Sequence, residues 1–266
     1  MKFTSALFSL ILFISLTACN NGISTFTGNG PMVKGSGNVI TENRDATENF
    51  SKLTARGSVN VFLKKGDEQK IAIEAEDNIL PLVIVEIKNG ELIARTEGSM
   101  RTKKGVDIHI TYKDLLSITS SGSTDVKVAS TLSGKSISLS SSGSSDLIVD
   151  SIDTKDLEVK SSGSSDILIK QVLTNNLVAS LSGASDVRIT GITTNLKAST
   201  SGSSDLYAGE LSATTADLSS SGSSDIKVRV SDKLTAKASG SSDIHYHGNP
   251  KDVAESKSGS ASISRK

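Results

Sequence analysis

Seven aspartates recur in one short motif, Ser-Gly followed by two small residues and Asp, at intervals of about 20 residues. They are Asp125, Asp146, Asp166, Asp186, Asp205, Asp225 and Asp243. The glycines of the same motifs are Gly122, Gly143, Gly163, Gly183, Gly202, Gly222 and Gly240. Seven copies in phase indicate an internal structural repeat. If successive repeats lie on one another, the seven carboxylates form a column.

Such a column has three candidate roles. Carboxylates about 4.8 Å apart repel by about 0.9 kcal/mol in water, so some interaction must offset the repulsion. In the first interpretation, each carboxylate accepts hydrogen bonds from turn N–H groups and Ser hydroxyls, as Asp commonly does in turns. In the second, the column binds Ca²⁺, which prefers carboxylate and carbonyl oxygens. In the third, it recognises a partner. The sequence favours the first, because one carboxylate per repeat supplies few metal ligands, and it predicts no other cofactor.

The aspartates do not have the pattern of a catalytic site. A polysaccharide-active enzyme needs one tuned acid and one tuned base, which should break the symmetry of the repeat. The acids here repeat almost identically, so we predict that the protein is not an enzyme and has no catalytic residues. His245 and His247 lie two residues apart on one strand face, where we interpret them as solvated, and we expect the isolated His109 to be structural.

The residues around each motif alternate between apolar and polar side chains. Two apolar residues follow each Asp at spacing two, as in Val126 and Val128, and a similar pattern precedes each glycine, as in Leu157 and Val159. Alternation with period two predicts short strands with one buried face. A weaker third apolar position occurs at Ile152, Val172, Ile192 and Leu211.

A unit of about 20 residues cannot bury its apolar side alone, but stacked units can, because each strand pairs with its counterpart in the next unit. The sequence therefore predicts an all-β protein, a right-handed parallel β-helix (β-solenoid) with coils of about 20 residues. Glycine permits a positive φ at each corner. We expect buried serines two positions before glycine to form an internal hydroxyl ladder; they are Ser120, Ser141, Ser161 and Ser220.

The two ends of the array are less regular. A weaker copy of the motif begins at Gly57, with Asn60 in the Asp position, and another begins at Gly259, with Ser262 there. Residues 77–83 read as a short helical turn or a cap. The predicted solenoid domain spans residues 38–266, with an irregular N-terminal part at 38–113 and regular repeats at 114–266.

The N-terminal segment predicts export and lipidation. Lys2 precedes an apolar run too short for a typical membrane span, and the run ends in Leu16-Thr17-Ala18-Cys19, which resembles a bacterial lipobox. We predict a signal peptide at 1–18, lipidation of Cys19, which anchors the protein to a membrane, and a flexible tether at 19–37. The expected location is the cell envelope, as an outer-membrane lipoprotein on the periplasmic or exposed side.

Composition excludes some partners. The chain has 29 basic and 29 acidic residues, so it lacks the basic footprint of a nucleic-acid-binding protein. It has no Trp and 3% aromatic residues, which excludes a Trp-lined sugar cleft.

The chain resembles the head GIN domain family, also labelled auto-transporter adhesins and common in Bacteroidetes envelopes. The resemblance rests on residues 35–39, 50–53, 66–68 and 74–81 and on the Ser-Gly-Ser turns, and it covers about residues 35–266. It implies a repetitive β fold and an adhesin-like role, and it supplies no catalytic residues.

We therefore predict an envelope-anchored, non-catalytic interaction module with a glycan or protein partner. The alternative is a structural or self-assembling scaffold, in which open solenoid ends or the outward residues Ile148, Leu168 and Tyr207 drive homo-oligomerisation.

Overall fold

The computed structural model describes residues 31–46 and 48–266. The predicted signal peptide and the predicted lipidation site at Cys19 lie outside the described residues. Within those two ranges, no helix is long and apolar enough to cross a membrane.

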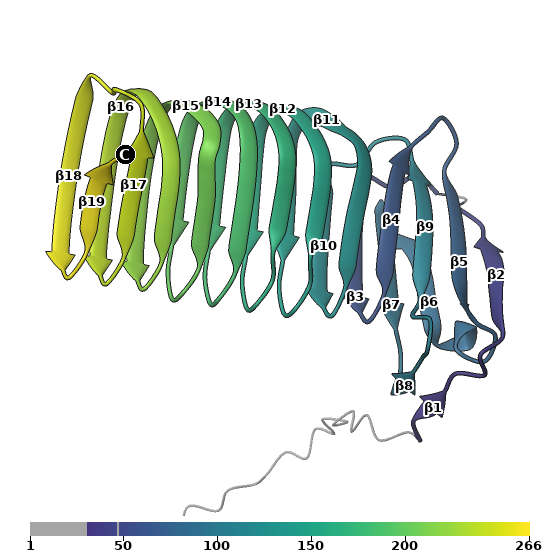
Figure 1. Cartoon of the computed structure of the whole chain (residues 1–266). Coiled ribbons are helices and arrows are strands. Elements are labelled where there is room, and N and C mark those ends of the chain that lie inside the picture. The colour runs from purple at the N-terminus through teal and green to yellow at the C-terminus, as the bar shows by residue number, and fades with distance from the viewer. Residues whose placement is uncertain (1–30, 47) are drawn as a thin grey trace, which may run out of the picture.

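The molecule is a stack of β coils that ends in a group of antiparallel strands on the N-terminal side (Figure 1). The irregular strands are β1 (Val33–Lys34), β2 (Val39–Arg44), β3 (Lys52–Gly57), β4 (Asn60–Lys65), β5 (Lys70–Glu76), β6 (Val83–Lys88), β7 (Glu91–Thr96), β8 (Met100–Arg101) and β9 (Asp107–Tyr112). The strands of the regular stack are β10 (Ser117–Gly122), β11 (Asp125–Ser141), β12 (Leu147–Ser161), β13 (Ile167–Leu181), β14 (Asp186–Thr200), β15 (Asp205–Gly222), β16 (Asp225–Gly240), β17 (Asp243–His247), β18 (Asp252–Gly259) and β19 (Ser262–Arg265).

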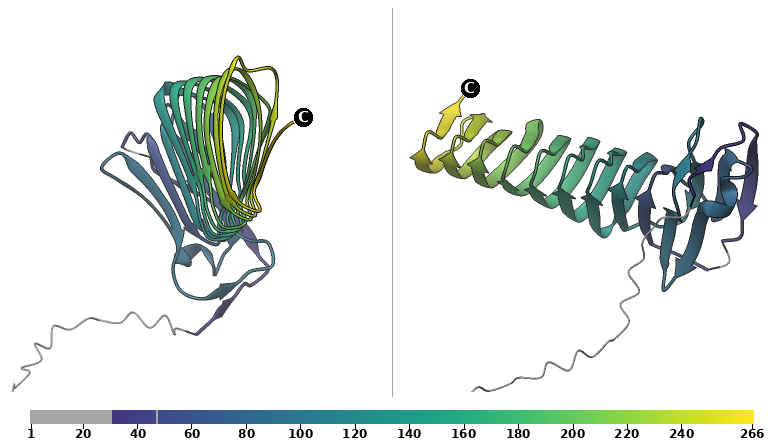
Figure 2. Two further views of the ribbon diagram at one scale, coloured as in Figure 1. Left: turned by 90° about the vertical axis from the view of Figure 1, so that its left-hand side faces the viewer. Right: turned by 90° about the horizontal axis from the view of Figure 1, so that it is seen from below.

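The strands of the regular stack pair in parallel with the same positions of the next coil. Leu147 pairs with Ile167, which pairs with Val187, so each buried aliphatic residue lies over its counterpart. Viewed along the stack, the coils superimpose as flattened loops (Figure 2). The prediction of a parallel β-solenoid is confirmed.

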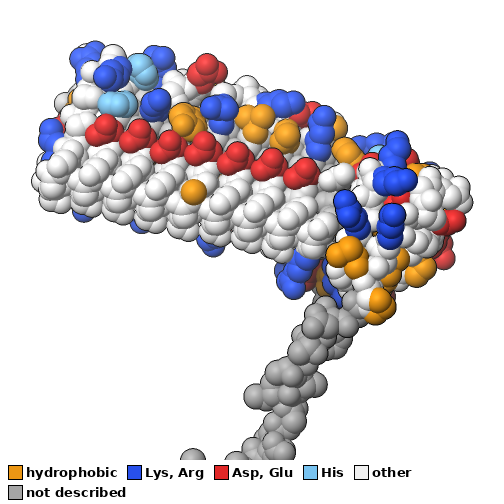
Figure 3. All heavy atoms as spheres, turned by 60° about the horizontal axis from the view of Figure 1, so that its bottom comes forward, with side chains coloured by type: hydrophobic (Ala, Val, Ile, Leu, Met, Phe, Trp, Pro, Cys, Tyr) orange, Lys and Arg blue, Asp and Glu red, His pale blue; other side chains and the backbone are white. Residues whose placement is uncertain are grey.

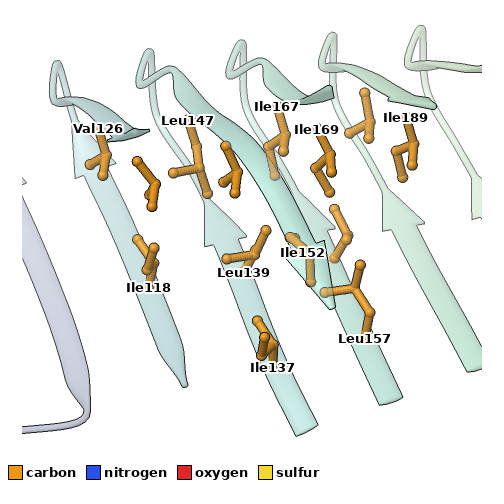
Figure 4. Close-up of a cluster of buried hydrophobic side chains, with 14 of the residues drawn as sticks. Ile118, Val126, Ile137, Leu139, Leu147, Ile152, Leu157, Ile167, Ile169 and Ile189 are labelled. Carbon is orange, nitrogen blue, oxygen red and sulfur yellow. The ribbon is translucent and has the colours of Figure 1, made fainter. Parts of the chain in front are cut away.

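The core is a continuous spine of aliphatic side chains inside the coils (Figure 4). Ile118, Leu139, Val159 and Ile169 are each no more than 1% exposed. Each such side chain contributes about 1.5–3 kcal/mol by leaving water, which offsets the entropy lost when the chain is ordered.

The third apolar position is predicted correctly in three coils and wrongly in one. Ile152, Val172 and Leu211 are buried, but Ile192 is 56% exposed. The register pairs Gly191 with Val172, so Gly191 takes the buried position and Ile192 faces outward beside Leu173. The interval from Gly183 to Gly202 is one residue shorter than the two intervals before it, and the missing residue shifts the register between Ile189 and Gly191 by one position.

The corner glycines are required for two reasons. Gly143 has a φ of +82°, a conformation that other residues adopt at a cost. A Cβ at this position would also lie 2.7 Å from the carbonyl oxygen of Gly122. That oxygen accepts a hydrogen bond of 2.8 Å from the backbone N–H of Ser144, so the corners form their own ladder.

Serines also close each turn from inside, which the sequence analysis missed. The hydroxyl of Ser145 donates a hydrogen bond of 2.8 Å to the carbonyl oxygen of Ser142. The same contact recurs in the later coils, made by Ser165, Ser185, Ser204, Ser224 and Ser242. These serines are fully buried, so their hydroxyls are paired rather than left without a partner.

The predicted hydroxyl ladder is present only in part. All four of its serines are buried, and Ser120 donates to the hydroxyl of Ser141 at 3.0 Å. Leu181 takes the equivalent place after Ser161 and interrupts the ladder.

The N-terminal part adds two layers below the regular stack. Gly57 pairs with Gly122 and Asn60 with Asp125, so the weak motif copy at Gly57 is in phase, as predicted. Strands β7 and β9 lie one layer further on, paired in parallel with β3 and β4. Strands β5 and β6 then pair antiparallel with β9 and β7 and end the parallel stack. The predicted helical turn is a 3₁₀ helix at Leu80–Leu82.

The predicted limit of the tether at residue 37 is wrong. Strand β1 pairs with β8 from Val33 onward. The backbone N–H of Gly37 donates to the carboxylate of Glu76 at 2.8 Å, and that of Ser36 donates to the side-chain oxygen of Asn78 at 2.9 Å. The ordered body therefore includes residues 33–37, held by side chains that lie about 40 positions further along the chain.

The C-terminal end continues the stack and then stops it. Gly259 pairs with Gly240 and Ser262 with Asp243, as the weak second copy predicts. In β18, Glu255 pairs with Ala236 and Lys257 with Ala238, so charged residues stand at positions that are buried and apolar one coil earlier. Inward-facing charges on a last strand disfavour the addition of a further strand.

Candidate partner-binding face

The seven predicted aspartates form one column on the outside of the solenoid. Each lies where the first strand of its coil begins, and the register pairs Asp186 with Asp205 and Asp225 with Asp243. Figure 3 shows them as a continuous red row along the stack. We call these seven residues the Asp column.

Asp107 extends this column, although the sequence analysis did not include it. Asp107 pairs with Asn60, which pairs with Asp125, and the Asn60 amide donates to the Asp107 carboxylate at 2.7 Å. The Ser-Gly motif is absent here, because Asp107 follows Gly105 by two residues instead of three. The alternation of Val106, Ile108 and Ile110 was the available signal.

Hydrogen bonds between coils stabilise the Asp column. The backbone N–H of Asp186 donates to the Asp166 carboxylate at 3.1 Å, and that of Asp225 donates to Asp205 at 2.9 Å. Asp243 accepts from both the backbone N–H and the hydroxyl of Ser262. The donors are backbone N–H groups and a Ser hydroxyl, the groups named in the first interpretation, and they belong to the next coil.

The Asp column still carries unbalanced negative charge. Partial burial, followed by the charges of Asp125 and Asp166, raises the pKa of Asp146 above its ordinary value. Burial and the charges of Asp166 and Asp205 raise the pKa of Asp186 in the same way. In the described part of the chain, no aspartate of the column has a Lys or Arg partner in an ion pair.

The geometry offers Ca²⁺ no clustered ligands. Nowhere in the described ranges do three or more His, Cys, Asp or Glu side chains converge as a metal site. The carboxylates lie in a line, one per coil, whereas Ca²⁺ takes six to eight oxygen ligands around a point.

A second outward column runs beside the first, two residues further along each strand. We call it the mixed column. Its members are His109, Phe62, Lys127, Ile148, Leu168, Arg188, Tyr207, Lys227 and His245. In Figure 3, orange, blue and pale blue side chains lie next to the red row, on the same face of the molecule.

Two rings of the mixed column, on adjacent coils, stack on each other. Phe62 and His109 lie with ring centroids 5.0 Å apart and an interplanar angle of 17°. His109 is therefore an exposed stacking residue, not the isolated structural residue expected from sequence. His245 and His247 face outward as expected, and Nδ1 of His245 hydrogen-bonds the hydroxyl of Ser264 at 2.9 Å.

Tyr207 lies between two cations. The Arg188 guanidinium is 4.9 Å from its ring centroid and the Lys227 ammonium is 5.3 Å away, each supplied by an adjacent coil. The Tyr207 hydroxyl donates to the Asp205 carboxylate at 3.0 Å, and this bond raises the pKa of Tyr207. Both ring faces are thus occupied by neighbours from the same column.

A shallow hollow of about 220 Å³ lies between the two columns in the middle of the stack. It is lined on one side by Asp146, Asp166 and Asp186. Ile148 and Leu168 form the other side, and Arg188 and Tyr207 close one end. The two aliphatic residues are half-buried and remain in contact with solvent.

Several solved structures share this fold. A "putative adhesin" from Parabacteroides merdae superimposes with a TM-score of 0.84 at 18% identity, covering 88% of this chain and 99% of that one. A "putative lipid binding protein" from Parabacteroides distasonis gives 0.82 at 21% identity, with coverage of 88% and 99%. A "putative adhesin" from the same species gives 0.84 at 19%, covering 88% and 100%.

No curated protein is similar enough in sequence to count as a relative. The family described as "Putative auto-transporter adhesin, head GIN domain" matches residues 49–250, which is more than half of the chain. This protein therefore belongs to the head GIN domain family.

Proposed function

We propose that this protein is a lipid-anchored, non-catalytic recognition module of the cell envelope that binds a macromolecular partner through the face bearing the Asp and mixed columns. The adhesin names of the family and of two of the structural neighbours agree with a binding role at the cell surface. Cys19, in its lipobox-like sequence, supplies the anchor in this proposal.

The observation that carries the proposal is the composition of the mixed column. It combines aliphatic, aromatic and Arg side chains at solvent-facing positions, and aromatic residues and Arg are enriched in protein interfaces. A surface that serves only solubility would have no use for Ile148 and Leu168 beside three carboxylates.

The fold suits presentation of this face. Backbone ladders and the aliphatic spine join every coil to the next, so the face belongs to a rigid body. The described N-terminus and the last coil lie at opposite ends of the molecule (Figure 1). An anchor at Cys19 would then hold the antiparallel end towards the membrane.

The alternative of a self-assembling scaffold has less support. Association end to end would add a strand to β18, where Glu255 and Lys257 face the position of the next core. Light scattering at high concentration tests this alternative, and a strict monomer is the expected result.

Non-catalytic binding agrees with the even environment of the carboxylates. Each aspartate of the Asp column occupies the same turn position, and the two resolved pKa shifts go in the same direction. A glycosidase needs two carboxyl groups with opposite tuning. Incubation with a panel of polysaccharides, followed by a reducing-sugar assay, is expected to give no product.

Two measurements test the proposal. Palmitate labelling and protease treatment of intact producing cells should show a lipidated, protease-accessible protein, and Cys19→Ala should abolish both label and membrane retention. Purified protein lacking the signal peptide should bind a member of an envelope and host glycan or protein array. A protein that is unlabelled, inaccessible and without ligands would contradict the proposal.

A further inference from the structure

The hollow between the two columns has the chemistry of a peptide-binding groove. We infer that its occupant is an extended polypeptide segment in which Lys or Arg alternates with aliphatic residues, lying across the coils of β12, β13 and β14. This inference rests on the proposed function and names the partner class for the same face.

The spacing of the two columns fits an extended peptide. The columns stand two residues apart on each strand, which is about 6.6 Å at the rise of a β-strand. Side chains of an extended peptide alternate to opposite sides. A peptide that runs along the hollow therefore directs one set of side chains to the Asp column and the other set to Ile148 and Leu168.

The side formed by the Asp column requires a cationic occupant. Asp146 and Asp186 have raised pKa values because burial and neighbouring aspartates disfavour their ionised forms. None of the ion pairs within the described residues includes Asp146, Asp166 or Asp186, and only Arg188 partly offsets the charge of Asp186. Ammonium or guanidinium groups of a partner would relieve this repulsion, and an anionic partner would increase it.

The other side requires an apolar occupant of limited length. Ile148 and Leu168 are adjacent in the mixed column, with Lys127 on one side of the pair and Arg188 on the other. The apolar stretch therefore spans two coils, which is about 10 Å at the spacing of strands in a sheet. Only a few aliphatic side chains of a peptide fit between the two cations.

The aromatic residues of this face are poor platforms for sugar rings. Tyr207 is the aromatic residue that lines the hollow, and Arg188 and Lys227 lie over its ring from the two adjacent coils. A sugar that stacks on an aromatic residue needs a free ring face. The observations therefore favour a peptide over a glycan in this groove.

Isothermal titration of the protein lacking only its signal peptide tests the inference with defined probes. The probes are a short alternating Lys-Leu peptide, the matching Glu-Leu and Lys-Ser peptides, and a glucosamine oligosaccharide as an amine-bearing glycan. We expect the Lys-Leu peptide to bind most tightly and its affinity to fall as salt is raised, because the charges are exposed.

Two double variants locate the site, each with a matched control. Asp146→Asn with Asp186→Asn should weaken Lys-Leu binding about fivefold or more, whereas Asp153→Asn with Asp217→Asn removes the same charge elsewhere and should change it less than twofold. Ile148→Ser with Leu168→Ser should weaken it similarly, and Leu173→Ser with Val178→Ser should not. Melting temperatures confirm that each variant is folded.

The inference is overturned if the Glu-Leu peptide or the oligosaccharide binds as tightly as the Lys-Leu peptide, or if control and groove variants lose affinity equally. It is also overturned if no probe binds while the array identifies a partner whose binding needs the same face. In that last case the proposed function stands and only the partner class is wrong.

Discussion

The inner and outer surfaces of the same strands follow different rules. On the inside, Leu147, Ile167 and Val187 stack as one aliphatic type. One residue further along, on the outside, the column changes from Ile148 and Leu168 to Arg188. Each inner residue must fit the same position of its neighbours at crystal-like density, whereas an outer residue meets solvent or a partner. The comparison teaches that the repeat encodes the fold, whereas the outer column is free to depart from the repeat and carries the proposed recognition face.

The largest effect should come from breaking the inner repeat at a corner. Gly163→Ala places a Cβ 2.7 Å from the carbonyl oxygen of Gly143 at a φ of +81°, so we expect a loss of about 3 kcal/mol or more in the free energy of unfolding. Gly209→Ala is the matched control, because a Cβ there meets nothing within 4 Å. Urea denaturation measures both variants, and equal losses would contradict the corner argument.

A cavity in the spine should be the next largest effect. Leu157→Ala removes a side chain that is 2% exposed, and we expect a cost of about 2–5 kcal/mol. Leu173→Ala removes the same atoms from a side chain that is 53% exposed and should cost about 0.5 kcal/mol or less. A Leu173 variant as unstable as the Leu157 variant would mean that the inner and outer faces are assigned wrongly.

Making the last coil resemble the interior should alter association. Glu255→Val with Lys257→Val replaces the inward charges of β18 with residues that suit a continued core. We expect concentration-dependent oligomers of the variant in light scattering, because an apolar open strand recruits a further strand. Monomers at all concentrations would show that these charges are not what keeps the end free.

The smallest effect is a pH dependence of the outer column. Asp146 and Asp186 have folded pKa values above the ordinary value, so the native state binds more protons than the unfolded chain just above that value. Acidification from pH 7 should therefore stabilise the wild type relative to Asp146→Asn with Asp186→Asn. The change should stay below about 1 kcal/mol because solvent screens exposed groups. Denaturation midpoints at pH 7 and about pH 4 measure it, and a change of opposite sign would contradict the raised pKa values of these two carboxyls.

The sequence predicts what repeats and misses what does not. The coils and the Asp column follow from a motif that occurs seven times, because identical positions must stack. The prediction for Ile192 was wrong because its coil lacks one residue before Gly191, and this shifts the register by one position, which alternation alone does not reveal. The place of Asp107 in the column and the hydrogen bond from Gly37 to the Glu76 carboxylate were missed, because both depend on pairing between distant segments that carry no repeat.

The mixed column could be predicted from the sequence only in part. The sequence identifies Ile148, Leu168 and Tyr207 as outward residues, but it does not place His109 or Phe62 in this column. The sandwich of Tyr207 between Arg188 and Lys227 and the hollow beside the Asp column require the register of the coils.

Attachment of producing cells is the most direct test of a recognition face on this side of the solenoid. Adherence to the substratum or partner identified by the array should be measured for cells with wild-type protein and with two variants that are equally abundant at the surface. One variant carries Ile148→Ser, Leu168→Ser and Tyr207→Ser, and the other carries Leu173→Ser, Val178→Ser and Ile192→Ser. We predict that the first variant loses most of the attachment and the second retains it. Equal attachment by both variants, or loss only in the second, would contradict the account.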